Sequence, residues 1–148
     1  MSVAANLAAV RARIADAAVR SGRAAQSVQL VLVTKTVEPE RVLEAVRAGQ
    51  ADLGENKVQE GRRKAEALAG QPVRWSMIGH LQSNKVKDVL RFAHEVQSLD
   101  RLSLAEALEK RLQFLGRGLD VLREVKPWNQ AGKHGWARGE GAGFLGQL

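Results

Sequence analysis

The chain has 148 residues and a formal net charge of +7, a length that suits one domain with a buried core. It contains no cysteine, which excludes disulfides, thiolate catalysis and thiolate metal sites and fits a cytoplasmic protein. The sequence also has no run of about 20 apolar residues, so we expect no membrane span.

Helices and strands are predicted to alternate along the whole sequence. The first element is an Ala-rich amphipathic helix over 3–21, which Gly22 ends. The predicted strands are 28–34, 51–56, 73–79, 95–100 and 119–125, and the helices that follow the first four are 39–48, 58–70, 83–93 and 101–116. Strands separated by helices of this length are typical of an α/β protein with a parallel sheet.

Two parallel architectures fit this alternation, an arc of a (β/α)8 barrel and an open doubly wound sheet. Strand order distinguishes them, because a barrel keeps sequential neighbours whereas a doubly wound sheet reverses after the first strand. No Gly-rich phosphate loop follows the strand at 28–34, which argues against the usual nucleotide-binding form of the second architecture.

The stretch "LVLVTKTVEPE" places a lysine at the end of an apolar strand. Val31, Val33 and Lys35 share one face of an extended chain. Lys35 therefore either lies just past the strand end and reaches water or has a chemical role. A desolvated lysine has a lowered pKa and attacks aldehydes, which suits imine formation with a carbonyl compound such as pyridoxal phosphate (PLP).

Polar residues also follow the next three predicted strands. They are Gly54-Glu55-Asn56, Ile78-Gly79-His80 and Ser98-Leu99-Asp100. Ligands of parallel α/β proteins bind at the carboxyl ends of strands, so these residues are candidate site residues. Several of them also have a purely structural interpretation. Asn56 and Asp100 could cap the helices that follow them, His80 could be a structural histidine, and Gly54 and Gly79 could be turn residues. Ser83 could likewise cap the predicted helix over 83–93.

The ordered motifs "VLVTKTV", "LGENKVQE", "WSMIGHLQSNK", "VQSLD" and "AGKHG" resemble the YggS/PROSC family of pyridoxal-phosphate homeostasis proteins. The resemblance is strong over residues 1 to about 125 and weak beyond. It implies a single (β/α)8 TIM-type barrel with an extra N-terminal helix, of which residues 1–148 form about five βα units in one partial domain, with barrel units from 28 onward.

The resemblance also implies the site. Lys35 would hold PLP as a Schiff base, Asn56 would lie beside the cofactor ring, and Met77 and His80 would line the pocket floor. Ser98, from "VQSLD", is assigned to the same cofactor site. Lys133, from "GKHG", matches a second family lysine that would relay the cofactor to and from Lys35. No metal site is expected.

Two departures from the family pattern are visible. The family usually has an asparagine soon after the fifth strand, where this sequence has "KPW". The family's phosphate-binding elements, a Ser/Gly-rich turn and a strand-end segment, have no counterpart in these 148 residues. We therefore expect the residues to be part of a longer barrel, a monomer when whole, and unable to complete the phosphate site alone.

By this resemblance the protein stores, delivers or buffers PLP without established turnover, with apo PLP-dependent enzymes as recipients. The first alternative is an amino-acid racemase of the same fold, which needs a second acid/base; the alanine-racemase pattern uses a tyrosine there, and this sequence contains none. The second alternative is a basic nucleic-acid-binding domain. Its basic residues, as in "RRK", "KVKD" and "EKR", are interleaved with acids, so we expect no nucleic-acid partner.

Overall fold

The computed structural model describes residues 2–126. The elements in chain order are α1 (Val3–Arg20), β1 (Leu32–Val33), α2 (Pro39–Arg47), β2 (Asp52–Glu55), α3 (Val58–Ala67), β3 (Arg74–Met77), the 3-10 turn η1 (Ser83–Lys85), α4 (Val86–Val89), β4 (Glu95–Leu99), α5 (Leu102–Leu115) and β5 (Asp120–Arg123). No helix in this part of the chain is long and apolar enough to cross a membrane.

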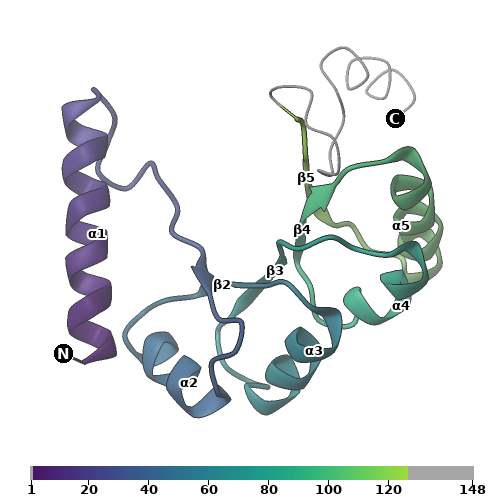
Figure 1. The fold of residues 1–148 in the computed structure, drawn as a ribbon, viewed down its shortest axis with the longest axis horizontal. Helices are drawn as coiled ribbons and strands as arrows, with labels where there is room; N and C mark the ends of the chain where they lie inside the picture. The colour runs from purple at the N-terminus through teal and green to yellow at the C-terminus, as the bar shows by residue number, and fades with distance from the viewer. Residues whose placement is uncertain (1, 127–148) are drawn as a thin grey trace.

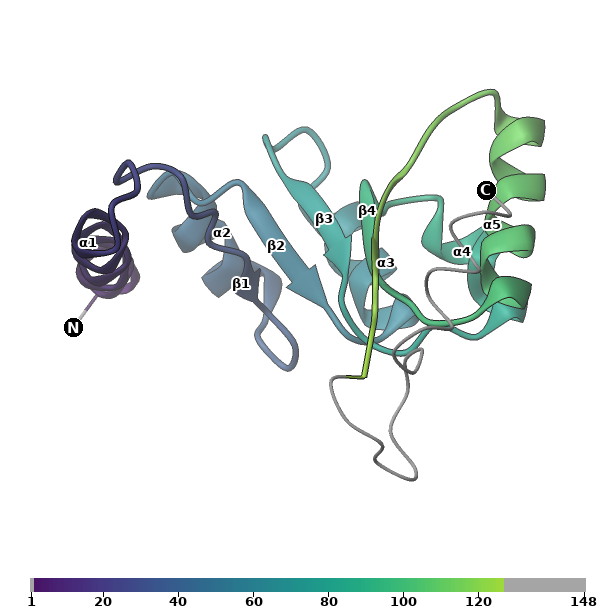
Figure 2. The ribbon, with the colours of Figure 1, turned by 90° about the horizontal axis from the view of Figure 1, so that it is seen from above.

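The five strands form one parallel sheet with the order β1-β2-β3-β4-β5. In Figure 1, α2, α3, α4 and α5 follow the outer side of the curved sheet, and Figure 2 shows the strands side by side from above. Sequential order without a reversal is the arrangement of a barrel arc, so the doubly wound alternative is wrong.

The core lies between the sheet and these helices. Leu53, Met77 and Val96 face it from three consecutive strands, each exposed by at most 1%. The rings of Trp75 and Phe92 meet edge to face with centroids 6.4 Å apart, a favoured aromatic geometry. Alternation along the strands therefore places one apolar face under the helices, as expected for βα units.

Strand β1 is much shorter than the predicted strand over 28–34. Among the described residues it pairs only with β2, through Leu32 and Val33. Val33 is 45% exposed, and Val121 at the opposite edge of the sheet is 42% exposed. Within residues 2–126, apolar side chains are thus exposed on both edge strands of the arc.

The predicted helix over 83–93 is also wrong in its extent. The chain forms only η1 and the four-residue α4, because the backbone then tightens to bonds three residues back, from Arg91 to Asp88 and from Phe92 to Val89. Phe92 is buried there beside Trp75. A Cβ added at Gly61 would lie 2.6 Å from the Phe92 ring, so the glycine in α3 makes room for it. His94 N–H then donates to the Trp75 carbonyl at 2.8 Å, directly before β4 begins.

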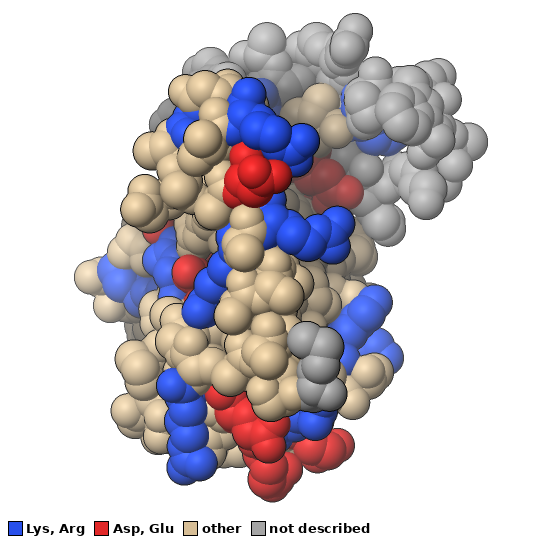
Figure 3. Space-filling view, turned by 90° about the vertical axis from the view of Figure 1, so that its left-hand side faces the viewer, with Lys and Arg blue, Asp and Glu red and all other residues tan. Residues whose placement is uncertain are grey.

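Helix α1 lies at the β1 end of the arc (Figure 1) and matches the predicted N-terminal helix. The Ser2 hydroxyl caps it by accepting from Ala5 N–H at 3.1 Å. Arg11 ties it to the segment after α2, donating to the Ala48 carbonyl at 3.2 Å and to Gln50 Oε1 at 2.8 Å. On the α1 side of the molecule, Lys and Arg side chains are interspersed with Asp and Glu (Figure 3).

Candidate functional site

Lys35 lies on a tight turn directly after β1. Thr34 N–H donates to the Gly54 carbonyl at 3.0 Å and continues the pairing with β2, and Val37 N–H donates back to the Thr34 carbonyl at 3.0 Å. Residues 34–37 therefore form a β-turn with Lys35 in its second position. Lys35 is exposed, so the expectation of a desolvated lysine is wrong. The strand ends before it, and the turn carries it into solvent.

A pocket of about 440 Å³ opens at the carboxyl edge of the sheet beside α3, within the usual volume range of small-molecule sites. Three of the predicted site residues line it: Asn56, Met77 and His80. The structure thus brings these three together from the ends of β2 and β3. The other lining residues are Lys57, Val58, Gln59, Glu60, Gln82 and Lys85.

Gly79 brings the loop after β3 against the loop after β2. A Cβ at this position would lie 2.9 Å from Asn56 Cα and closer still to the Asn56 carbonyl oxygen. Only glycine permits such an approach between two backbones. Gly79 is therefore the residue that allows Asn56 and His80 to line one pocket.

Asp100 holds His80 from the end of β4. Its carboxylate is 4% exposed, and Oδ2 lies 3.4 Å from His80 Nδ1, while Arg101 Nη1 donates to Oδ1 at 2.6 Å. Arg101 also donates to the Leu81 carbonyl at 2.7 Å. Asp100 thus joins the β4 end to the loop that carries His80, and the N-cap position of α5 belongs to Arg101.

Among residues 2–126, the other predicted site residues do not line this pocket. Met77, which does, is 1% exposed and also belongs to the hydrophobic core. Ser98 is 2% exposed, and its Oγ is buried with no hydrogen-bond partner among the described residues. Lys133 lies outside the described residues. Asn56 precedes the α3 N-cap, which is Lys57, and Ser83 accepts from Arg101 at 3.3 Å.

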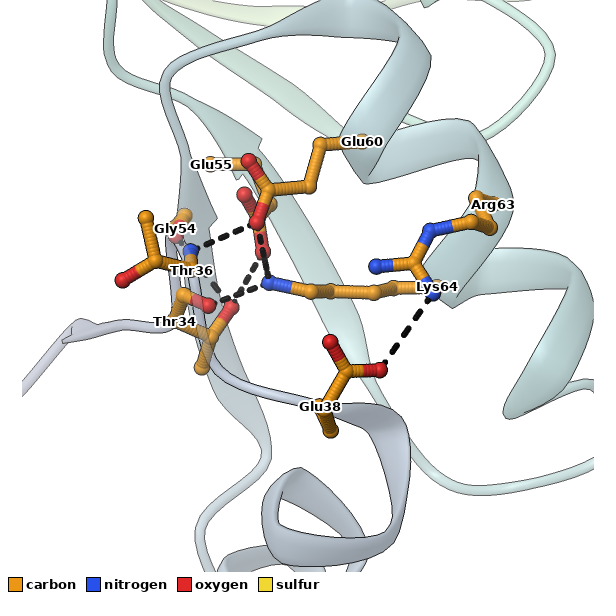
Figure 4. Close-up of polar contacts among 8 residues, drawn as sticks. All are labelled: Thr34, Thr36, Glu38, Gly54, Glu55, Glu60, Arg63 and Lys64. Carbon is orange, nitrogen blue, oxygen red and sulfur yellow. Dashed lines mark hydrogen bonds and ion pairs between the residues drawn. The ribbon is translucent and has the colours of Figure 1, made fainter.

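A fully buried lysine beneath the Lys35 turn was missed by sequence reasoning. Lys64, on α3, is 0% exposed, and its Nζ contacts the Thr34 carbonyl, Glu55 Oε1 at 2.6 Å and Glu60 Oε1 at 2.9 Å (Figure 4). These three acceptors use all three protons of an ammonium group. A buried charge is tolerated when it is paired and hydrogen-bonded in this way.

The carboxylates of this cluster also bind the neighbouring strand and turn. Thr34 Oγ1 donates to Glu55 Oε1 at 2.6 Å, and Thr36 N–H donates to Glu60 Oε1 at 2.6 Å. The hydrogen bond from Lys64, followed by that from the Thr36 amide, lowers the pKa of the Glu60 carboxyl below its ordinary 4.5. Glu60 is therefore charged at neutral pH.

The sequence did carry a signal for this cluster. Val58, Gly61, Lys64 and Leu68 follow the 3–4 spacing of a buried helical stripe, so Lys64 occupies a core position in an otherwise amphipathic helix. Glu55 follows Leu53 on the buried face of β2 by strand alternation. A lysine and a glutamate, each on the inner face of adjacent elements, predict a buried ion pair.

The structure thus defines a class of protein: an arc of a parallel βα barrel with a lysine-bearing turn and a small-molecule pocket at the carboxyl edge of its strands. No family model matches the chain. It is 38% identical over 136 residues to the pyridoxal phosphate homeostasis protein of Pseudomonas aeruginosa, covering 92% of this chain and 59% of that protein. The corresponding protein of Aquifex aeolicus is 38% identical over 135 residues, again with 59% of its length covered.

Solved structures agree with this match. A protein of unknown function from Bifidobacterium adolescentis superposes with a TM-score of 0.86 at 32% identity, covering 97% of this chain and 62% of that one. PipY of Synechococcus elongatus PCC7942, solved with PLP bound, gives a TM-score of 0.78 at 35% identity, covering 91% and 63%. The chain belongs to the pyridoxal phosphate homeostasis protein family, and it spans about three fifths of the length of these relatives.

Proposed function

We propose that this protein binds PLP as a Schiff base on Lys35 and thereby stores, buffers and delivers the cofactor without turning over a substrate. The observation that carries the proposal is the placement of Lys35 at the same edge of the sheet as the pocket lined by Asn56, Met77 and His80. The similarity to PipY, whose structure was solved with PLP bound, supports it.

The described residues fit this cofactor. PLP supplies an aldehyde, and its condensation with a lysine amine forms a C=N bond and releases water. Lys35 is exposed, so a cofactor can reach its amine from solvent and leave again, as storage and delivery require. Lys57 and Lys85 line the pocket and bring positive charge toward an anionic ligand.

The other residues take supporting roles in the proposal. Asn56 and His80 present polar groups to the ring from two neighbouring loops, and Met77 provides the apolar floor. Asp100 orients the His80 ring through Nδ1. Ser98 and Lys133 stay predictions of the sequence, with Lys133 as the relay lysine, and apo PLP-dependent enzymes stay the predicted recipients.

Reduction of the imine tests the attachment residue. The full chain mixed with PLP should develop the near-visible absorbance of a protonated imine, and borohydride should fix the cofactor to the peptide that contains Lys35. Lys35→Ala should lose the band. Lys85→Ala is the matched control, because Lys85 lines the pocket and should keep the band. An adduct on Lys57, Lys85 or Lys133 with Lys35 unmodified would refute the proposal.

A second measurement separates a carrier from a racemase. A racemase exchanges the α-proton of its amino acid with solvent, whereas a carrier does not need to. We expect no PLP-dependent incorporation of deuterium into a panel of amino acids in heavy water. Clear exchange with one of them, lost in Lys35→Ala, would favour the enzyme.

A further inference from the structure

Helix α3 grips the loop between β1 and α2 at three alternate residues. Lys64 donates to the Thr34 carbonyl, Glu60 accepts from the Thr36 amide at 2.6 Å, and Arg63 lies 3.6 Å from the Glu38 carboxylate (Figure 4). Lys35 lies between the first two contacts. The backbone is thus fixed by α3 immediately before and immediately after the lysine.

The turn that carries Lys35 is unfavourable by itself. Thr36 has a φ of 64° and is the only non-glycine residue between 2 and 126 with a positive φ. This conformation is rare for a β-branched residue, because its Cβ crowds the backbone. Strained residues of this kind persist where the surroundings impose them. Here the bond from Thr36 N–H to Glu60 and the bond from Val37 N–H to the Thr34 carbonyl hold the turn.

Glu60 and Lys64 act as one unit. Lys64 Nζ contacts both the Thr34 carbonyl and Glu60 Oε1, the same oxygen that accepts from Thr36. The lysine is anchored in the core by Glu55 Oε1 at 2.6 Å. Glu60 also lines the pocket with Asn56 and His80. The two side chains therefore link the buried core, the turn that bears Lys35 and the pocket wall.

From this geometry we infer that Glu60 and Lys64 are positioning residues for Lys35: they hold the backbone on both sides of it and so fix the position from which its amine reaches a cofactor at the carboxyl edge of the sheet. The inference rests on the proposed function, in which Lys35 is the attachment residue for PLP. It adds that the rate and the site of attachment are set by two residues of α3, neither of which forms a bond to the cofactor.

The test uses the full chain and two independent readouts. The first is amide hydrogen exchange at Thr36 without cofactor, which reports these backbone contacts themselves. The second is the rate of imine absorbance after PLP is added, with borohydride trapping to map the modified lysine. The variants are Glu60→Ala, which removes the acceptor, Glu60→Gln, which keeps an acceptor oxygen without the charge, and Arg63→Ala as the matched control. Arg63 contacts the same loop, but its side chain is 55% exposed.

In Glu60→Ala we expect faster exchange at Thr36 and roughly tenfold slower attachment at Lys35, since small losses of alignment have such effects on reaction rates. A larger share of the trapped cofactor should then be found on Lys57 or Lys85. Thr36 exchange and the attachment rate in Glu60→Gln should lie between those of wild type and Glu60→Ala. In Arg63→Ala both should equal those of wild type.

A rescue variant separates positioning from a general loss of stability. Glycine adopts a positive φ without strain, so Thr36→Gly in the Glu60→Ala background should recover most of the attachment rate at Lys35. Lys64→Met is measured in parallel, and the Glu60 series carries the test if that variant does not fold.

Two results would overturn the inference. One is unchanged Thr36 exchange in Glu60→Ala. The other is an attachment rate and lysine distribution equal to wild type in that variant. Failure of the proposed function has a different signature, because the wild-type chain itself would then carry no adduct at Lys35 while Thr36 exchange still responded to Glu60→Ala.

Discussion

Two lysines on neighbouring elements have opposite environments. Lys35, at the end of the apolar β1 strand, is exposed, whereas Lys64, in a charged stretch of α3, is 0% exposed. The apolar strand before Lys35 suggests burial of that lysine, whereas for Lys64 only the helical spacing with Val58 and Gly61 indicates a core position. Burial of a charged side chain is decided by whether acceptors surround it in the folded chain, and Lys64 has three of them. The apolar residues before Lys35 supply none.

Of the substitutions that test this contrast, replacing Lys64 should have the largest effect on the free energy of unfolding. Lys64→Met leaves the Glu55 carboxylate, which is 0% exposed, without its cation. We expect a loss of about 3–5 kcal/mol in the free energy of unfolding, as for one broken partner of a buried pair, measured by equilibrium urea denaturation. Lys57→Met, on the exposed N-cap of the same helix, should change it by less than about 0.5 kcal/mol.

A second variant then sharpens the interpretation of the first. Adding Glu55→Gln to Lys64→Met removes the orphan charge and should recover part of the loss. Equal stability of Lys64→Met and Lys57→Met would instead show that the buried ion pair contributes nothing to folding.

Replacing Thr34 should have the next largest effect on the free energy of unfolding, because its hydroxyl donates to the Glu55 carboxylate that also binds Lys64. Thr34→Val keeps the shape of the side chain but removes the donor that lies 2.6 Å from Glu55 Oε1. The expected loss is about 1.5–3 kcal/mol, as for a hydrogen bond to a charged group, again from urea denaturation. Thr34→Ser keeps the hydroxyl and is the control. A larger loss in the serine variant than in the valine variant would contradict this account.

The cluster should also make stability depend on pH. The folded-state pKa of Glu60 is lowered below 4.5 by Lys64 and the Thr36 amide, so the unfolded state takes up a proton first as the pH falls. The stabilisation is fully present above the unfolded pKa and is lost as the pH falls through the folded pKa. Glu60→Gln should therefore lose stability at neutral pH and approach wild type in acid.

Urea midpoints between about pH 7 and about pH 3 measure this convergence, since that range begins above the ordinary carboxyl pKa and extends below it, where the stabilisation is lost. Glu66→Gln, on the same helix with a side chain 71% exposed, is the control. Parallel pH curves for wild type and Glu60→Gln would show that the Glu60 charge does not stabilise the fold.

Lys35 should have the smallest effect on stability. Its side chain is exposed, and Lys35→Ala should change the free energy of unfolding by less than about 0.5 kcal/mol. The same variant should lose the imine band with PLP. Urea denaturation and absorbance on one preparation would measure both. A stability loss comparable to that of Lys64→Met would remove the contrast between the two lysines.

Much of the fold could be predicted because it depends on local patterns. The alternation of helices and strands and the position of α1 follow from apolar periodicity and from Gly22, Pro39 and Gly49 at element ends. Errors occurred where tertiary packing overrode these patterns. The helix predicted over 83–93 ends at Val89, and Phe92 fills the space above Gly61. The strand over 28–34 shrank to the two residues that find a partner in β2.

The candidate site also has one part that the sequence could predict and one part that it could not. Polar residues at strand ends indicated Asn56, His80 and Asp100, and the parallel sheet brings such ends to one edge, so their convergence was predictable. The roles within the set were not. Asp100 holds His80 rather than capping α5, and Ser98 faces the core, because side-chain partners depend on which loops meet in space.

By itself the sequence determined the βα alternation, the family resemblance and the placement of Lys35 after the first strand, since these depend on residue order and on the periods of helix and strand. Helical spacing indicated a core position for Lys64, but only the tertiary structure supplied the acceptors that allow its charge to be buried. Lys64 becomes a core residue because Thr34, Glu55 and Glu60, from three different segments, place their oxygens around one nitrogen. Lys35 is exposed because it lies on the turn after β1, which Glu60 and Lys64 hold, and not within the packed strand.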